Sequence, residues 1–312
     1  MSTPSTDHSD FNTWLTQEVQ PAVDDHIERS LQSQRHYEQL WYQIQSGGKR
    51  LRPGLVMLVG KLCECDDRRL LDCAAGVELL HTFSLVHDDL VDGDQLRRNA
   101  PAFWVEYGTD AAVNIGDMLL SHALTLFPDG ARSIAAESVR TMTVGQQLDF
   151  ALTDRRGVSE SEYMEMVRKK TGALFDCCLK LPQTLTAIDL SIDGYGALWP
   201  AFQIRDDLLD FEAGKGRSAI GGDVRAGKRT LLAIHADDAQ VYDILDKPAR
   251  DTTDEDVRTV QTIFEESGSF TYARQQMHSL AFEAIAVLST LPDSPQRRRL
   301  TTLARYCTDR DH

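Results

Sequence analysis

Two short runs of aspartates are the residues of this chain best suited to chemistry. The first run holds Asp88, Asp89 and Asp92, and the second holds Asp206, Asp207 and Asp210. On a helix, residues four apart share a face, so the first and last carboxylates of each run would lie together. Like charges this close repel each other unless a cation neutralises them. Carboxylate oxygens in a partly open cluster suit Mg²⁺, which keeps several waters and is often shared with substrate phosphates.

An Asp-Asp-x-x-Asp run also has an ordinary interpretation, because such runs commonly form the solvated face of a helix. Two observations favour a metal site instead. Both runs lie in mostly apolar surroundings, and the same arrangement occurs twice in the chain. A charge cluster at the end of a buried helix costs more free energy than an exposed one unless it is neutralised. The sequence therefore predicts two metal-binding sets of aspartates, named here the first and the second triad.

Cationic residues accompany the triads in three clusters. They are Lys49 and Arg52 in the Gly-Gly-Lys-Arg-Leu-Arg-Pro stretch 47–53, the pair Arg97 and Arg98, and the pairs Lys170–Thr171 and Lys228–Thr230. Glycines allow the backbone to approach an anion, and guanidinium groups bind phosphates. Each cluster alone is equally explained as a basic turn or as charge compensation. Together with the triads, the clusters predict a polyanion site in which metal ions and phosphates meet.

The elements that would position these residues are helices. Helical patterns cover 11–30, 34–44, 51–63, 69–91, 111–127, 131–152, 159–181, 185–212, 230–245, 254–266, 270–291 and 297–306. Strand-like alternation is scarce, and long helices with short links favour an all-α bundle. No composition shift marks a boundary, so we expect one domain over residues 1–312, with residues 1–10 flexible.

The overall charge excludes one class of partner and indicates an environment. A net charge of −15 argues against binding nucleic acid through a basic footprint. Aspartate outnumbers glutamate by 33 to 15, and arginine outnumbers lysine by 25 to 8. We interpret this composition as adaptation to a salt-rich cytosol, where a Debye length of about 3 Å screens the self-repulsion. A GC-rich genome is the competing explanation for the arginine excess.

Nothing in the sequence predicts a membrane span or a secreted protein. No apolar run reaches the length of about 18 residues that a spanning helix needs. The first residues lack the basic and apolar blocks of a signal peptide, so we expect a cytoplasmic protein. The six cysteines include no Cys-x-x-Cys pair, which indicates buried thiols rather than a zinc site or disulfides.

The order of the motifs resembles that of the trans-isoprenyl diphosphate synthases, and most of all the archaeal geranylgeranyl diphosphate synthases. The chain carries Gly-Gly-Lys-Arg-x-Arg-Pro from Gly47, His-Asp-Asp-x-x-Asp from His87 with Arg-Arg after it, Lys-Thr from Lys170, Phe-Gln-x-x-Asp-Asp-x-x-Asp from Phe202, and Gly-Lys-x-Thr from Gly227. The likeness covers residues 47–230. It implies an isoprenoid-synthase-type helical bundle around a central cavity, usually a homodimer, with the triads facing each other across the cavity mouth.

The resemblance also implies a role for each motif residue. Three Mg²⁺ ions per active site would be held by Asp88 and Asp92 on one side and Asp206 on the other, with Asp89, Asp207 and Asp210 in support. The allylic diphosphate would be bound by Arg97, Lys170, Thr171, Gln203 and Lys228. Isopentenyl diphosphate would be bound by Lys49, Arg52, His81 and Arg98. The alternative for His81 is a hydrogen-bonded histidine of the core.

The implied reaction is the head-to-tail condensation of isopentenyl diphosphate with an allylic diphosphate into a short all-trans prenyl diphosphate. Metal ions and cationic side chains would neutralise the leaving diphosphate, so that the allylic C–O bond ionises. Two alternatives stay open. A terpene cyclase shares the fold and the first triad but usually differs at the second metal motif. A non-catalytic or partner-dependent subunit of a prenyl synthase would be expected to have lost a triad.

The chain departs from the family pattern at a few positions. Asn99 stands where glycine normally follows Arg-Arg, Trp104 where histidine is common, and Trp199-Pro200 where a small pair precedes Phe-Gln. Ser218 stands where a lysine is usual, with Lys215 and Arg217 nearby. These changes leave both triads intact but raise the question of lower activity or of a partner subunit.

Product length should depend on the depth of the cavity below the first triad. The growing chain would extend along the helix of Asp88, and Phe83 lies about 7.5 Å deeper in that helix. Ser84 above it is small, and Leu80 lies nearly a turn below. With Phe83 as the floor we predict a C20 main product, and C15 is the alternative. In the other interpretation Phe83 is ordinary core packing, and the floor comes from residues 174–181.

Overall fold

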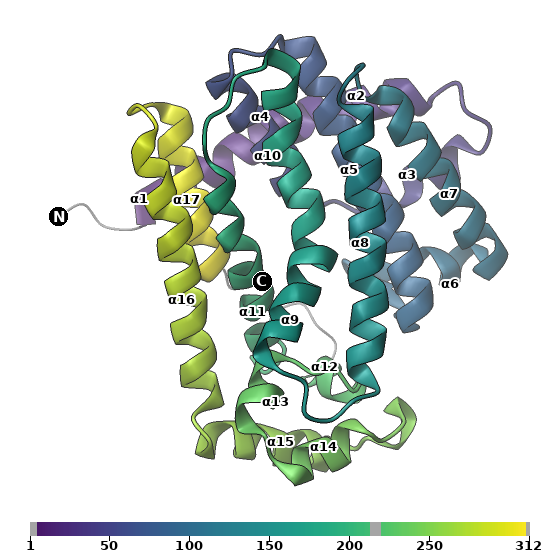
Figure 1. Cartoon of the computed structure of the whole chain (residues 1–312). Helices are drawn as coiled ribbons and strands as arrows, with labels where there is room; N and C mark the ends of the chain where they lie inside the picture. Colours follow the sequence, from purple (N-terminus) through teal and green to yellow (C-terminus); the bar gives the residue numbers. More distant parts are fainter. Residues whose placement is uncertain (1–4, 213–219, 310–312) are drawn as a thin grey trace. The chain divides into compact units, whose positions relative to one another are not determined.

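Helices make up most of the computed structural model, which describes residues 5–212 and 220–309 (Figure 1). This confirms the predicted all-α fold. Within those ranges the strands are β1 (Leu96–Arg97) and β2 (Ala100–Pro101), which pair as one antiparallel hairpin. The chain divides into two compact units, so the single domain expected over residues 1–312 stays a prediction. The loop with Lys215, Arg217 and Ser218 lies outside the described residues.

The first unit contains Met1–Val139, Leu174–Ile192 and Leu291–Thr302. Its helices are α1 (Ser5–Trp14), the π-helical turn η1 (Leu15–Val19), α2 (Gln20–Leu31), α3 (Tyr37–Gln45), α4 (Leu51–Leu62), α5 (Asp67–Asp92), α6 (Phe103–Tyr107) and α7 (Thr109–Leu126). Parts of α8 (Arg132–Thr153), α10 (Ala173–Thr186) and α17 (Pro295–Asp309) also belong to it. Helix α1 begins inside the segment that the sequence analysis expects to be flexible.

Helix α5 positions the first triad. It begins at an N-cap, Asp66, whose carboxylate accepts the N–H groups of Arg68 and Arg69. It ends at Gly93, whose φ of 71° is the left-handed conformation that glycine adopts at helix ends. Between these caps its apolar side chains are buried against α4 and α7. The triad therefore sits on the last turn of a long, well-packed helix.

The hairpin that follows α5 turns through Arg98 and Asn99. Both residues have positive φ angles, 53° and 63°, as the two-residue turns favoured in hairpins require. Asparagine tolerates this conformation better than most residues, so Asn99 supports the same turn that a glycine would. The hairpin returns Arg97 toward the end of α5.

The second unit contains Arg140–Ala173, Asp193–Thr290 and Leu303–His312. Besides the rest of α8 and α17, its elements are α9 (Glu160–Val167), the π-helical turn η2 (Arg168–Gly172), the 3₁₀ turn η3 (Asp193–Ala197), α11 (Leu198–Leu209), α12 (Gly222–Arg225), α13 (Leu231–Ala236), α14 (Ala239–Leu245), η4 (Ala249–Asp251), α15 (Asp254–Glu266), α16 (Ser269–Val287) and η5 (Leu288–Thr290). Helices α11 and α16 lie side by side (Figure 1). Helix α11 carries the second triad.

Two predicted helices are wrong in extent. The helix predicted over 185–212 starts only at Leu198, because positive φ angles, such as 57° at Ala187, end the preceding helix. The helix predicted over 230–245 is broken at Asp237, whose φ is 44°. The short helices α6 and α12 are absent from the sequence prediction. In the two predicted helices a local turn conformation overrides an apolar pattern that continues through it.

The cysteines agree with the buried thiols that the sequence indicates. All six cysteines are free and buried. Burial raises the pKa of the thiols of Cys73 and Cys177 to about 12, so both stay protonated at neutral pH. In the ranges that the structure describes, no helix combines the length and apolar character needed to cross a membrane.

Candidate active site

The carboxylates of the first triad differ in exposure. Asp88 is partly exposed, Asp92 is exposed and Asp89 is completely buried. The Oδ1 atom of Asp89 accepts hydrogen bonds from Nε of Arg97, at 2.8 Å, and from its Nη2. Burial raises the pKa of Asp89, and the guanidinium partly offsets this effect. The hairpin thus fixes the middle carboxylate, while Asp88 and Asp92 share one face of the last helical turn.

Positively charged arginines lie near His81, which is about two helical turns before the first triad on α5. Burial, followed by the charges of Arg52 and Arg98, lowers the pKa of His81 well below its ordinary value. The imidazole is therefore neutral at neutral pH. The guanidinium of Arg52 lies 4.1 Å from the centre of the Phe175 ring, a cation–π contact that orients it. Three of the residues predicted to bind isopentenyl diphosphate, Arg52, His81 and Arg98, are thus brought together.

The Gly-Gly-Lys-Arg turn contacts this cluster closely. The buried Arg50 anchors the turn through ion pairs with Asp24, at 2.7 Å, and Glu78, at 2.9 Å. A Cβ atom on Gly48 would lie 2.7 Å from Nη2 of Arg98, so a larger residue would displace that guanidinium. The φ of 138° at Gly48 strains any larger residue, and Arg50, to which the sequence assigns no role, holds the turn in place. Lys49 in the same turn is exposed.

The middle carboxylate of the second triad is held by neutral donors. The Oδ2 atom of Asp207 accepts the hydroxyl of Tyr163 at 2.7 Å, and its Oδ1 accepts the amide of Gln203 at 3.0 Å. Burial raises the pKa of Asp207 to about 6, although both hydrogen bonds oppose this shift. Burial also raises the pKa of Tyr163 well above its ordinary value. The phenol therefore stays protonated and remains a donor.

Asp210 has a structural role that its place in the second triad does not indicate. Its side chain is 1% exposed. Its Oδ1 accepts the N–H of Gly222 at 3.0 Å, and its Oδ2 accepts the N–H of Asp223 at 2.9 Å. These bonds satisfy the first N–H groups of α12. Asp206 is partly exposed, so the two triads present different sets of carboxylates to their surroundings.

Two lysines converge on a buried carboxylate of α8. Oδ2 of Asp149 accepts hydrogen bonds from Nζ of Lys170, at 2.5 Å, and from Nζ of Lys228, at 3.4 Å. Burial would raise the pKa of Asp149, but the two lysines outweigh it and the net shift is downward. Asp149 is therefore ionised and holds both ammonium groups in one place. One carboxylate against two ammonium groups leaves a net positive charge at this position.

The turn that carries Lys170 is π-helical, and Gly145 accommodates it. A Cβ atom on Gly145 would lie 2.1 Å from the backbone N of Lys170. Neither backbone can move away easily, so only glycine permits this contact between α8 and η2. Asp149 follows one helical turn later on the same face of α8. The glycine and the carboxylate together place the lysine, and such π turns frequently mark functional sites.

A small cavity of about 70 Å³ lies among these groups. It is lined by Asp149, Tyr163, Met166, Lys170, Thr171, Gln203, Asp207, Asp223, Lys228, Arg229 and Thr230. The residues predicted to bind the allylic diphosphate that meet here are Lys170, Thr171, Gln203 and Lys228. Arg97, the fifth, belongs to the first unit, where it is bound to Asp89.

Comparison with known proteins agrees with this geometry. The polyprenyl synthetase family matches residues 33–267. A geranylgeranyl pyrophosphate synthase of Geoglobus acetivorans is 32% identical over 93% of this chain and 96% of its own. A geranylfarnesyl diphosphate synthase of Natronomonas pharaonis is 33% identical over 89% of this chain and 91% of its own. A crystal structure of a Caulobacter crescentus polyprenyl synthase, complexed with calcium and isoprenyl diphosphate, matches with a TM-score of 0.88, at 28% identity, and covers 97% of this chain and 98% of that one.

This chain belongs to the polyprenyl synthetase family. The resemblance found in its motifs is confirmed, and the enzyme is a prenyltransferase. As in other polyprenyl synthetases, its fold is an all-α isoprenoid synthase fold.

The aspartates of this polyprenyl synthetase fit a divalent cation. Among the described residues, no three His, Cys, Asp or Glu side chains already converge as a complete ligand set. The donors are nevertheless carboxylates, which hard divalent cations prefer. In each triad the middle carboxylate is bound by the protein, whereas Asp88, Asp92 and Asp206 keep some exposure. The buried Oδ2 of Asp89 has no hydrogen-bond partner in the described part of the chain, which a nearby cation would compensate.

The two tryptophans that depart from the family pattern both have structural contacts. The indole N–H of Trp104 donates to the carbonyl oxygen of Asp94 at 2.7 Å and ties α6 to the segment after the first triad. Trp199 is buried and meets Tyr195 edge-on, with ring centres 5.7 Å apart. A Cβ atom on Gly172 would lie 3.4 Å from Trp199, so the indole packs on η2. Neither substitution removes a triad residue or a lysine.

The residues predicted to set product length occupy one stretch of α5. Leu80 is fully buried, and Phe83 is nearly so. The ring of Phe83 meets His87 edge-on at 5.2 Å. The hydroxyl of Ser84 donates to the carbonyl oxygen of His81 at 2.8 Å. Their role in chain length stays a prediction.

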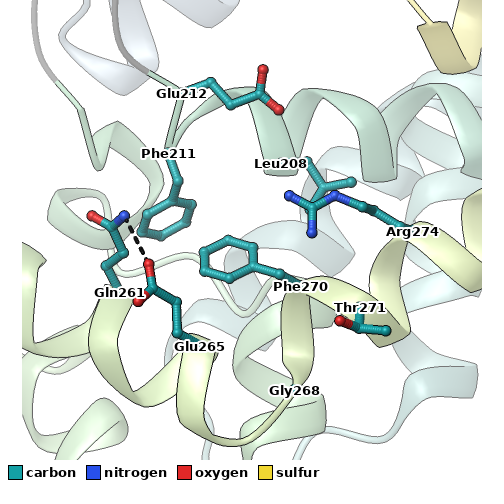
Figure 2. A pocket seen from close by; sticks show the side chains of 9 residues that line it. All are labelled: Leu208, Phe211, Glu212, Gln261, Glu265, Gly268, Phe270, Thr271 and Arg274. Carbon is teal, nitrogen blue, oxygen red and sulfur yellow. Dashed lines mark hydrogen bonds between the residues drawn. The ribbon is translucent and has the colours of Figure 1, made fainter.

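A second and larger cavity, of about 360 Å³, lies on another face of α11 (Figure 2). It is lined by Leu208, Phe211, Glu212, Gln261, Glu265, Gly268, Phe270, Thr271 and Arg274. The rings of Phe211 and Phe270 are 5.5 Å apart, and Arg274 points in from α16. Helix α11 therefore presents Gln203 and Asp207 to the small cavity and Leu208 to the large one, which Phe211, in the turn after α11, also lines.

The sequence analysis missed four residues that organise the site. They are Arg50, Gly145, Asp149 and Tyr163. A usable signal exists for two of them, because a glycine inside a helical pattern, followed by a carboxylate four residues later, marks Gly145 and Asp149. No local pattern marks Tyr163, which resembles any buried aromatic residue of an amphipathic helix.

Proposed function

We propose that this enzyme condenses isopentenyl diphosphate head-to-tail with an allylic diphosphate and makes an all-trans C20 prenyl diphosphate as its main product. The observation that carries the proposal is the presence of two clusters of cationic side chains, one in each unit, and each unit also carries one aspartate triad. A reaction with one diphosphate substrate needs one such cluster. Joining two diphosphates needs two.

The cluster of the first unit would bind isopentenyl diphosphate. Arg52 and Arg98 supply positive charge beside the neutral His81, which can donate or accept a hydrogen bond. Lys49, on the adjacent turn, adds an exposed positive charge. The cluster of the second unit would bind the allylic diphosphate through Lys170, Thr171, Gln203 and Lys228.

The proposed cofactor is Mg²⁺, with three ions per active site. Asp88 and Asp92 would hold two of them and Asp206 the third. When bound, Mg²⁺ neutralises the leaving diphosphate. Lys170 and Lys228 add to that neutralisation from a fixed position, because Asp149 holds both before substrate arrives. Asp149 holds the two lysines as an ionised carboxylate, so no proton transfer is needed to position them.

A proton must leave the elongated chain after the new C–C bond forms. The middle aspartates are committed to Arg97 and Tyr163, so neither is placed as a general base. We propose that the departing diphosphate accepts the proton, as the family resemblance implies. The chain's own contribution is to hold that diphosphate beside its lysines and to keep water out of the cavity.

Chain length is the least constrained part of the proposal. Relatives include geranylgeranyl diphosphate synthases and also geranylfarnesyl diphosphate synthases, which supports C20 as the main product and C25 as the second candidate. Phe83 would be the floor that stops growth at C20. Replacing its ring by a methyl group in Phe83→Ala should open the cavity and shift the products to C25 or longer.

We propose that the enzyme works as a homodimer, which the family resemblance implies. Light scattering of the purified protein measures the assembly state directly. A cytoplasmic location stays a prediction.

The proposal is tested by incubating the protein with labelled isopentenyl diphosphate, Mg²⁺ and each allylic primer in turn, at low and at molar KCl. Chromatography of the dephosphorylated products should show a C20 alcohol. A C15 or C25 main product would correct the chain length alone. No elongation with any primer, at either salt concentration, would contradict the proposed activity.

A further inference from the structure

Four side chains of the second unit form one continuous chain of hydrogen bonds that passes through the second triad. The hydroxyl of Thr171 donates to Oε1 of Gln203 at 3.0 Å. The amide of Gln203 donates to Oδ1 of Asp207 at 3.0 Å, and the hydroxyl of Tyr163 donates to Oδ2 of Asp207 at 2.7 Å. We name Thr171, Gln203, Asp207 and Tyr163 the relay. It links the lysine-threonine turn η2 with the aspartates of α11.

The ends of the relay are held by rigid elements. Tyr163 follows a capping box in which Ser159 and Glu162 satisfy each other's backbone N–H groups, and its side chain is 2% exposed. Thr171 belongs to η2, whose backbone lies against Gly145 of α8. The hydrogen bonds therefore connect two fixed positions, so a change at one end is transmitted to the other rather than absorbed by a mobile loop.

The direction of the bonds matters, because the hydroxyl hydrogen of Thr171 and one amide hydrogen of Gln203 are already used in these bonds. A carboxylate accepts and does not donate, so the amide nitrogen of Gln203 faces Asp207 and its oxygen faces Thr171. A diphosphate likewise has acceptor oxygens to offer. For Thr171 to bind one, its hydroxyl hydrogen must leave Gln203. The carbonyl of Gln203 then loses its donor, its amide is free to turn, and one oxygen of Asp207 is released.

We propose that the relay couples binding of the allylic diphosphate at Thr171 to binding of a divalent cation at Asp206. The inference rests on the proposed function. A carboxylate released from a hydrogen bond attracts a nearby cation more strongly, and Asp207 is the sequence neighbour of Asp206. Because coupling between two binding sites is reciprocal, a cation at Asp206 also favours the diphosphate at Thr171. Tyr163, Gln203 and Thr171 are thus positioning residues for the second triad.

A simpler role for the same bonds is to hold α9 and η2 against α11. That role and the proposed one differ in a measurable quantity. Loss of a purely structural bond lowers stability but leaves the ratio of ligand affinities with and without metal unchanged. Loss of a coupling bond changes that ratio.

The test measures the dissociation constant of geranyl S-thiolodiphosphate, an unreactive allylic analogue, by calorimetry at about 0.1 mM and about 10 mM Mg²⁺. Tyr163→Phe and Thr171→Val break the relay without adding charge, and Thr171→Ser keeps the hydroxyl. Tyr272→Phe is the matched control, because Tyr272 donates its hydroxyl to Glu160, also on α9, at 2.5 Å but lies outside the relay. Thermal unfolding checks that each variant is folded.

We expect Mg²⁺ to tighten binding of the analogue to the wild-type enzyme, and the tightening to fall by about tenfold in Thr171→Val. The fall should be smaller in Tyr163→Phe, because Thr171, Gln203 and Asp207 stay hydrogen-bonded there. In Thr171→Ser and Tyr272→Phe, the tightening by Mg²⁺ should stay within about twofold of the wild-type value. Should Tyr163→Phe fail to fold, the two variants of the partly exposed Thr171 decide the question. Wild-type tightening in Thr171→Val would overturn the relay. Failure of the wild-type enzyme to bind the analogue at all would instead overturn the proposed function.

Discussion

The two triads bury their middle aspartate with different chemistry. Asp89 is held by a charged guanidinium eight residues later in the chain, on a hairpin that directly follows its helix. Asp207 is held by a neutral hydroxyl 44 residues earlier and by an amide of its own helix. The first triad is therefore a local electrostatic unit. The second depends on tertiary packing of α9 against α11, and its buried carboxylate has no cation hydrogen-bonded to it in the described part of the chain.

The last aspartate of each triad shows a second difference. Asp92 is exposed at the end of α5, whereas Asp210 is buried and caps α12. The same sequence pattern thus supplies a solvent-facing carboxylate in one unit and a structural one in the other. An identical motif does not fix the role of each aspartate, because that role depends on the backbone groups that the fold places next to it.

The largest stability effect should come from breaking the ion pair of the first triad. Arg97→Met leaves the completely buried Asp89 without its charged partner and should lower the free energy of unfolding by about 3 kcal/mol. Arg29→Met is the control, since its pair with Asp25 is 61% exposed on both sides and should be worth less than about 1 kcal/mol. Urea denaturation measures both. Equal and small losses would mean that Asp89 is neutral in the folded protein.

A smaller effect should separate the last aspartates of the two triads. Asp210→Ala removes two hydrogen bonds from a carboxylate to the backbone of α12 and should cost about 2 kcal/mol. Asp92→Ala removes an exposed charge next to like charges and should change stability by less than about 0.5 kcal/mol. The same denaturation experiment compares them. If the two variants lose equal stability, the structural role of Asp210 is wrong.

The smallest effect concerns pH and the neutral surroundings of Asp207. Its pKa is raised to about 6 in the folded protein, so the folded state binds this proton more tightly than the unfolded chain does. Its contribution to stability is therefore greatest below the unfolded pKa of about 4 and is lost as the pH rises through 6. Relative to Asp207→Asn, the wild type should lose about 1 kcal/mol of unfolding free energy between pH 5 and 7.5. A constant difference between the two proteins over that range would contradict the raised pKa.

The parts of this site that the sequence predicted are those encoded by local patterns. Apolar periodicity gives α5, and the spacing of Asp88 and Asp92 gives their shared face. Arg97 is close to Asp89 in the chain, so its proximity could be anticipated even though its role as the partner of a buried carboxylate could not. The all-α fold follows from the same periodicity repeated along the chain.

The parts that the sequence did not predict depend on contacts between distant segments. The close approach of Gly145 to the backbone of Lys170 exists only once α8 and η2 pack together. The hydroxyl of Tyr163 points at Asp207 because of the way α9 packs on α11, and no spacing rule encodes this. The broken helix at Asp237 reflects a single left-handed residue inside an apolar pattern. Local propensity was overridden by tertiary structure at each of these positions.

The central claim is that the more exposed carboxylates of the triads hold the metal that drives the reaction. Turnover of labelled isopentenyl diphosphate by Asp206→Asn, as a function of Mg²⁺ concentration, tests it most directly. The account predicts a loss of turnover of about a hundredfold or more, with the thermal unfolding of the wild type retained. Asp129→Asn, at a fully exposed position on the first unit, should keep wild-type turnover. Near-wild-type turnover by Asp206→Asn at every Mg²⁺ concentration would contradict the account.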